Sequence, residues 1–388
     1  MEYLAFPVRF CHALTHTEPR TTPAIRRQTM WKTNWEETKQ HFCDWWSRRG
    51  LVLGMWGAPG SDACMHENVP RPPSPGSLRE AHVNADLRAQ RNHYELARRA
   101  FPADTLPISD TGIGPGSLAL LLGSEPGFSD ETVWFEPCIH ECSRPEELPP
   151  FKFDEGNQWW ITTEKTLVAC AKLARGKYVV GCPDLIENID ILAALRGPQL
   201  LMTDMIERPG WIEEKMPEIN QVWFEAYQRT YDIIKQDDGG AAFGAFSLWG
   251  PGKTAKVQCD ASAMFSPAMF QRFVVPSLTE QCEWLDYSMY HLDGTQAICH
   301  LDALLGIDAL DAIEWTPQSG LEDGGHPRWF DLYHRILDAG KAVQIVGVGK
   351  KEIVPVLDAV GSSGVYIMTS FSSSAEAEEI AAMVEPYR

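Results

Sequence analysis

Tyr287-Ser-Met-Tyr-His-Leu-Asp-Gly294 is the stretch of sequence that decides the predicted fold. Alternate side chains of a strand point to the same face, so Met289, His291 and Asp293 share one face. A helical pattern follows directly, from Thr295 to Leu305, and a glycine then stops it. A strand that ends in a base and an acid before a helix is typical of the catalytic end of a (β/α)8 barrel.

The same order of apolar run, polar end and helix recurs along the chain. Strands that alternate with helical patterns indicate parallel β/α units. About eight such signals favour a closed barrel over a doubly wound sheet, and no Gly-x-Gly-x-x-Gly pattern follows the first of them. Besides 287–293, we expect strands at 51–57, 178–184, 199–204, 241–250, 256–260, 312–317, 342–349 and 365–369.

We therefore predict a single (β/α)8 TIM barrel over residues 31–388, preceded by a tail at 1–30. A helix from about Asn34 to Arg49 extends its N-terminal side, and the loops at 58–77 and 101–160 are insertions over one end. Capping signals predict where helices begin: the pairs Asn34–Glu37, Ser77–Glu80, Asp184–Glu187 and Ser373–Glu376, and Ser266 before Pro267.

Composition limits the classes of partner. The 388 residues are 44% hydrophobic, which is enough for a large core, and carry a net charge of −19. Such a surface disfavours nucleic acids and anionic membranes. No apolar run approaches the roughly 18 residues of a membrane span. The ten cysteines are irregularly spaced, which indicates reduced thiols rather than a disulfide framework. We expect a cytoplasmic enzyme.

Four acidic or basic residues stand out as candidates for catalysis or substrate binding. His291 and Asp293, at a strand end, suit a general acid/base or the anchoring of a metal or substrate, although a neighbouring acid can also satisfy a buried histidine structurally. Asp260 ends another predicted strand and shares its face with Gln258. Asp104 lies in a loop between prolines, where it lines the site or simply forms a turn.

Tryptophans at three predicted strand ends are candidates for substrate binding. Trp56, Trp249 and Trp315 are suited to clamp a flat or cationic ligand, or else pack in the core. Glu314 and Thr316 share the face opposite to Trp315, so only one of the two sets points inward.

Two further motifs carry weaker signals. Cys138-Ile-His140-Glu-Cys142 offers ligand types that zinc prefers, but no second cluster accompanies it at a familiar spacing. Gly347 and Gly349 flank a valine and are suited to cradle a carboxylate or phosphate through backbone N–H groups.

From about residue 100 onward the sequence resembles the uroporphyrinogen decarboxylase superfamily. The similar runs are Leu195-Arg-Gly-Pro-Gln-Leu-Leu-Met-Thr-Asp204, Asp260…Phe265-Ser-Pro-Ala-Met-Phe-Gln-Arg-Phe-Val-Val-Pro276, Tyr290-His-Leu-Asp-Gly…His300-Leu-Asp-Ala-Leu-Leu and Ile313-Glu-Trp-Thr-Pro. The resemblance implies a (β/α)8 barrel. It also implies one of two activities, porphyrinogen decarboxylation or corrinoid-dependent methyl transfer.

The chain departs from the family's motifs at informative positions. The decarboxylases carry an N-terminal Arg-Gln-Ala-Gly-Arg motif that this sequence lacks, and their essential Asp best matches Asp104. Zinc-dependent thiol methyltransferases show His-x-Cys and a later Cys. Here the first motif is His291-x-Asp293, and Met368-Thr-Ser-Phe-Ser has no cysteine at the later position. The resemblance therefore favours a divalent metal such as zinc on His291 and carboxylate oxygens rather than on thiolates.

We predict methyl transfer between a small substrate and a corrinoid carrier supplied by a partner protein. His291 acts as base or metal ligand, with Asp293 and Asp260 as its partners. One alternative is a decarboxylase or other acid/base lyase, in which Asp104 and His291 handle protons on a small carboxylated substrate. Others are a glycoside-active barrel with paired acids and tryptophan platforms, or a binding protein without catalysis.

Overall fold

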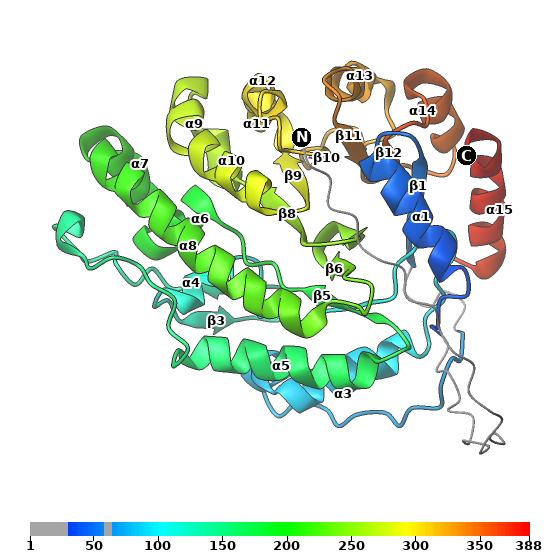
Figure 1. Ribbon diagram of the computed structural model, residues 1–388, viewed down its shortest axis with the longest axis horizontal. Coiled ribbons are helices and arrows are strands. Elements are labelled where there is room, and N and C mark those ends of the chain that lie inside the picture. The colour runs from blue at the N-terminus through cyan, green and yellow to red at the C-terminus, as the bar shows by residue number, and fades with distance from the viewer. Residues whose placement is uncertain (1–29, 58–63) are drawn as a thin grey trace, which may run out of the picture.

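The computed structural model of the protein describes residues 30–57 and 64–388. It is a mixed α/β structure built on a large parallel sheet (Figure 1). The six strands of that sheet all pair in parallel. In spatial order they are β1 (Leu51–Gly57), β12 (Val365–Phe371), β11 (Ala342–Ile345), β10 (Ala312–Thr316), β9 (Tyr287–Asp293) and β8 (Thr254–Gln258).

A second sheet has four short strands. In order they are β2 (Ile108–Ser109), β5 (Val179–Cys182), β6 (Ala241–Phe243) and β7 (Leu248–Gly250). The first three are parallel, whereas β7 returns antiparallel to β6. A separate hairpin joins β3 (Pro126–Phe128) and β4 (Val133–Phe135).

The strand ladders do not close into one barrel within the described residues. Two contacts nevertheless bring the sheets together at one edge. The backbone N–H of Asp104 donates to Leu53 O at 2.9 Å, and Met55 N donates to Thr105 Oγ1 at 3.0 Å. At the other edge, β7 leads directly into β8 through residues 251–253. The closed barrel that the sequence predicts is thus shown only in its coarser form, as a parallel α/β sheet.

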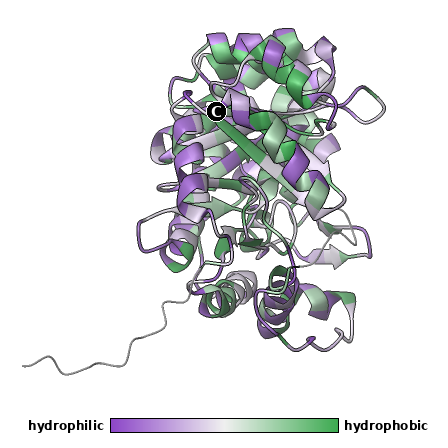
Figure 2. Ribbon diagram, turned by 90° about the vertical axis from the view of Figure 1, so that its right-hand side faces the viewer, coloured by the Kyte–Doolittle hydropathy of each residue, from purple (hydrophilic) through white to green (hydrophobic). Residues whose placement is uncertain are grey.

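Helices cover the sheets, and the apolar strands run through the interior (Figures 1 and 2). They are α1 (Trp35–Trp46), α2 (Leu78–Val83), α3 (Ala85–Leu96), α4 (Leu118–Leu121), α5 (Gln158–Ala174), α6 (Asn188–Arg196), α7 (Pro198–Glu207), α8 (Pro209–Ile234), α9 (Pro267–Phe273), α10 (Val275–Trp284), α11 (Gly294–Ala297), α12 (Leu301–Leu305), α13 (Phe330–Asp338), α14 (Ile353–Val360) and α15 (Ser374–Val384).

Helix α1 packs at the amino ends of the strands. Its Trp45 is fully buried and donates from Nε1 to Val343 O, near the start of β11, at 3.3 Å. Trp46 donates from Nε1 to Trp249 O at 2.9 Å. Since α1 covers this end, the carboxyl ends of the strands are free to form a site at the opposite end.

Three of the predicted helix starts are confirmed. The hydroxyls of Ser77, Ser266 and Ser373 accept from the backbone N–H three residues later, at 3.1–3.3 Å. Asn34 precedes α1 but makes no side-chain cap; its Nδ2 donates to Glu37 and to Ala103 O, both at 3.2 Å.

Two predicted strands and one predicted helix cap are wrong. Residues 199–204 belong to helix α7, because Gly197 (φ +87°) ends α6 and Pro198 starts a new helix at once. The run 241–250 is split into β6 and β7, because Phe246 and Ser247 adopt left-handed φ values of +59° and +52°. The predicted cap at Asp184–Glu187 is also wrong, since α6 begins only at Asn188.

Two predicted helices are interrupted, and parts of two other predicted segments lie outside the described residues. Asn84 divides the helix predicted from Ser77 into α2 and α3, and a 3-10 turn divides the helix after β9. Residues 1–29 of the predicted tail and 58–63 of the first predicted insertion lie outside the described residues.

Candidate functional site

One side-chain group joins the ends of β8 and β9. Asp260 follows β8 directly, and His291 and Asp293 lie on one face of β9. Their potential ligand atoms all lie within 4.8 Å of one another. Among the residues that the structure describes, this trio offers one nitrogen and two carboxylate ligands for a single ion. We call it the His–Asp triad.

Glu314 holds the histidine of the triad in place. It is fully buried and neighbours His291 in the register between β9 and β10. Its carboxylate hydrogen-bonds His291 Nδ1, and Thr316 donates from Oγ1 to its other oxygen at 2.6 Å. Because Nδ1 is occupied, Nε2 is the ring nitrogen left for a metal or a proton. A carboxylate behind a ligating histidine is the usual outer partner at metal centres.

The surroundings of the triad shift the pKa of His291 and the pKa of Asp260. Burial lowers the pKa of His291, but the carboxylate of Glu314 outweighs burial, and the net pKa is raised. Burial raises the pKa of Asp260. The positive charges of His291 and Lys256 oppose this rise, and the charge of Asp293 adds to it. In the metal-free protein the raised pKa of His291 therefore favours its protonated imidazolium form.

Three acids on the segment before and within α6 face β8. Asp184 Oδ2 accepts from Lys256 Nζ at 2.8 Å, and Glu187 accepts from the backbone N–H of Gln258. Asp190 accepts from the N–H groups of Asp260 and Ala261 at 2.7 and 2.8 Å, which fixes the backbone at Asp260. The residues on the two sides are Asp184, Glu187 and Asp190, facing Lys256, Gln258 and Asp260.

Burial is the main cause of a raised pKa at two of these acids, Glu187 and Asp190. Glu187 is 1% exposed, and burial holds its pKa well above the usual range. Burial, and then the charge of Asp260, raises the pKa of Asp190 to about 6. Neither Glu187 nor Asp190 was predicted from the sequence as a site residue. Their spacing of three residues was the available signal, but it equally suits an ordinary helix start.

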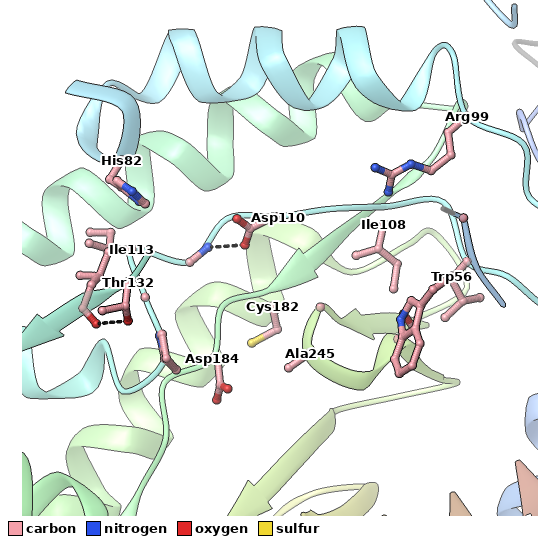
Figure 3. Close-up of a pocket in the computed structure, with 18 of the residues that line it drawn as sticks. Trp56, His82, Arg99, Ile108, Asp110, Ile113, Thr132, Cys182, Asp184 and Ala245 are labelled. Carbon is pink, nitrogen blue, oxygen red and sulfur yellow. Dashed lines mark hydrogen bonds between the residues drawn. The ribbon is translucent and has the colours of Figure 1, made fainter. Parts of the chain in front are cut away.

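A cavity of about 690 Å³ opens beside the triad, between β1, β2, β5 and the segment 244–247 (Figure 3). Trp56, 42% exposed, lines one part of it, and Asp184 lines another, with Cys182 and Ala245 drawn between them. Phe246 follows Ala245 and packs its ring 4.6 Å from the ring of His291. The segment 244–247 is thus shared by the cavity and the triad.

The other predicted binding residues do not line this cavity; they are Asp104, Trp249, Glu314 and Trp315. Of these four, Glu314 contacts the triad, through His291. Asp104 is fully buried and bonds His41 Nδ1 at 2.7 Å, Arg388 at 2.6 Å and Leu53 N at 2.9 Å.

Two of the three predicted tryptophans are core residues. Trp249 is buried against Trp46 under α1 and donates from Nε1 to Gln236. Trp315 is fully buried and packs against Trp329, with the two rings tilted and their centroids 4.9 Å apart, on the face opposite to Glu314. Of the three, only Trp56 lines the cavity.

The weaker motifs also have structural roles. Arg196 Nη1 donates to the carbonyls of Ile139 and Cys142 at 2.8 and 2.7 Å, so the Cys138–Cys142 segment is pinned to α6. Its thiols are free, and the segment forms no group of three metal ligands among the described residues. The N–H of Gly349 donates to Glu352 Oε2 at 2.9 Å, so it is already occupied.

Comparison with known proteins supports the fold. No protein-family model and no curated protein matches the sequence. A solved structure, a methyltransferase from Methanosarcina mazei, is similar with a TM-score of 0.53 and 11% identity, over 90% of this chain and 97% of that chain. The chain therefore shares the overall fold of that structure. In the described residues, no helix is both long and apolar enough to span a membrane.

Proposed function

We propose that the protein is an enzyme that moves a methyl group between a small molecule and a corrinoid carrier, as a divergent member of the uroporphyrinogen decarboxylase superfamily. The observation that carries the proposal is the His–Asp triad beside a cavity of about 690 Å³, at the strand ends of a methyltransferase-like fold. Ligand sites at strand carboxyl ends are the rule in barrel enzymes.

The two sheets are best understood as the two arcs of a distorted (β/α)8 barrel. Asp104 and Thr105 connect the arcs at β1, and the β7–β8 turn connects them at the other edge. In such a barrel the cavity and the triad lie at one mouth. Segment 244–247, which connects β6 to β7, interrupts the regular strands of the second arc and lies at this mouth.

The donor set of the triad fits a divalent metal. His291 Nε2 and one oxygen each from Asp260 and Asp293 would hold the ion, and the outward exposure of both aspartates leaves room for a substrate atom. One nitrogen and two oxygens suit zinc, manganese or ferrous iron better than a soft, thiolate-bound metal. A metal bound there supplies Lewis acidity toward an oxygen or nitrogen of the substrate.

A second candidate is acid/base lyase chemistry, including decarboxylation. The raised pKa of His291 and its bond to Glu314 favour it, since both equip the imidazole to hold and deliver a proton near neutral pH. The predicted partner Asp104 does not reach this group, because it is bonded to His41 and Arg388. In this alternative, Asp260 or Asp293 takes the role of the second acid.

The two candidates differ in their products. Purified protein reconstituted with zinc, manganese or ferrous iron is incubated with cob(I)alamin and a panel of methyl ethers, methylamines and methyl thioethers. Formation of methylcob(III)alamin, followed by its absorption spectrum, supports methyl transfer. Release of carbon dioxide from carboxylated compounds without cobalamin methylation would instead establish the lyase.

A further inference from the structure

Asp184 and Lys256 form a charge pair where the cavity meets the triad. Asp184 lines the cavity, and its Oδ2 accepts from Lys256 Nζ at 2.8 Å. Its backbone carbonyl accepts from the N–H groups of Gly116 and Ser117 at 3.0 and 3.3 Å, which fixes its position. Its other carboxylate oxygen, Oδ1, is buried and has no partner among the described residues.

Lys256 extends from β8 into the interior and is 2% exposed. Its ammonium carries three N–H donors. Two of them meet Asp184 and the side-chain oxygen of Gln258, and the third has no acceptor in the part of the chain that the structure describes. The pKa values of His291 and Asp260 are raised overall, and the charge of Lys256 opposes both of these rises. The ammonium therefore lies close enough to the triad to act on it electrostatically.

The ionisable groups around Lys256 leave Asp184 as its direct counter-ion. Glu187 is held neutral by burial, and Asp260 and His291 belong to the triad. An unpaired buried oxygen and a spare N–H are each unfavourable without a ligand. Because the charges of Lys256 and Asp184 balance, the pair requires no charged ligand. The pair fits a neutral head group whose heteroatom accepts a hydrogen bond before reaction and donates one afterwards.

We propose that Lys256 is a catalytic acid that protonates the oxygen or nitrogen from which the methyl group departs. The inference rests on the proposed methyl transfer. In that step the bond between carbon and the heteroatom breaks, and its electron pair stays on the heteroatom. The methyl group bonds to the cobalt(I) of the corrinoid substrate, whose electron pair forms the new bond. The heteroatom takes the proton from Lys256 and then donates a hydrogen bond to Asp184 Oδ1, while solvent restores the proton of Lys256.

The substrate class follows from this geometry. It is a neutral methyl ether or N-methyl compound whose apolar body lies against the walls near Trp56, Cys182 and Ala245. The volume of the cavity is sufficient for an aromatic ring, and the exposed face of Trp56 is suited to stack on one. A methyl donor whose leaving group departs as a neutral molecule without taking up a proton gains nothing from Lys256. A sulfonium ion, which releases a thioether, is such a donor.

The test compares methyl donors whose leaving groups differ in their need for a proton. Anisole, 4-nitroanisole and trimethylsulfonium serve as methyl donors to cob(I)alamin for wild type, Lys256→Met and Lys256→Arg. We expect Lys256→Met to lose about 10²-fold or more in rate with anisole. It should lose less than about tenfold with 4-nitroanisole or trimethylsulfonium, because those leaving groups need no proton. Lys256→Arg keeps the charge but is a far weaker acid, so it should show the same selective loss.

Lys341→Met is the matched control, because Lys341 is also a buried lysine, bonded to the carbonyls of Ile307 and Leu310 away from the cavity. Its rates per folded molecule should equal those of wild type with every donor. Equal losses for all donors in both Lys256 variants would overturn the inference and leave a structural role. If Lys256→Met does not fold, the donor dependence of Lys256→Arg decides. A wild type that methylates cobalamin from no donor contradicts the proposed function instead.

Discussion

His291 derives its chemistry from one neighbour. The Glu314 carboxylate outweighs burial and raises the pKa of the imidazole, while it leaves Nε2 toward Asp260 and Asp293. The period of a strand was sufficient to predict that His291 and Asp293 share a face and that Glu314 and Trp315 lie on opposite faces, but not which of the latter two points inward. The pair Asp184–Lys256 could not be predicted, because its members are 72 residues apart and meet only through the tertiary fold.

The first prediction concerns Glu314→Gln in the metal-free protein. The variant removes the anion that raises the pKa of His291, so that pKa should fall below its usual value of about 6.5. Stability from a raised histidine pKa is complete below 6.5 and is lost as pH rises through the folded value. The variant should therefore be less stable than wild type by about 2–4 kcal/mol at pH 6, with a smaller difference at pH 9. Urea unfolding across pH, with NMR titration of His291, measures both; a pH-independent difference would contradict the assignment.

The second prediction concerns Asp293→Asn. The amide keeps the shape but removes the charge, so turnover should fall by about 10²-fold or more. Stability should change by less than about 0.5 kcal/mol, since the side chain is exposed at the strand end. Asp302→Asn, an exposed aspartate on α12, is the control and should retain activity. Full turnover with reduced stability in Asp293→Asn would make the residue structural.

At the scale of elements, the helix starts at Ser77, Ser266 and Ser373 were predictable because a cap is a local interaction. The break between β6 and β7 was not, because partners from distant strands impose it. Gln344 Nε2 donates to Phe246 O at 2.8 Å, and Tyr366 OH donates to Ser247 O at 2.9 Å. These bonds from β11 and β12 hold two left-handed residues beside His291.

The third prediction tests the strain in this segment. Ser247 has φ +52°, a conformation that glycine adopts without cost. We expect Ser247→Gly to be more stable than Ser247→Ala by about 1 kcal/mol, because the left-handed conformation penalises any Cβ. Tyr366→Phe should lose about 1 kcal/mol with its hydrogen bond. Urea unfolding of the three variants gives the comparison; equal stability of the glycine and alanine variants would show that the segment relaxes.

At the scale of the whole molecule, parallel strands separate two polar centres. The triad and the cavity form where strands end, whereas Asp104 binds His41 of α1 and Arg388 at the side that α1 covers. The parallel α/β plan and the triad's place at strand ends were predictable from recurring local patterns. The role of Asp104 was not, since its partners come from the two extremes of the described chain.

The fourth prediction follows from this separation. Asp104→Ala leaves His41 and Arg388 without their buried partner, so the free energy of unfolding should fall by about 3–5 kcal/mol. The metal content and turnover of the molecules that remain folded should match those of wild type. Activity lost without any loss of stability would return Asp104 to the catalytic role of the lyase alternative.

The central claim is that Asp260, His291 and Asp293 hold one divalent metal. Elemental analysis of protein reconstituted with zinc, manganese or ferrous iron and then freed of excess metal tests it most directly. We expect one equivalent of one of these metals per chain in wild type and in the Cys138→Ser/Cys142→Ser double variant. We expect less than about a tenth of that in His291→Ala. A full equivalent of metal in folded His291→Ala would contradict the account.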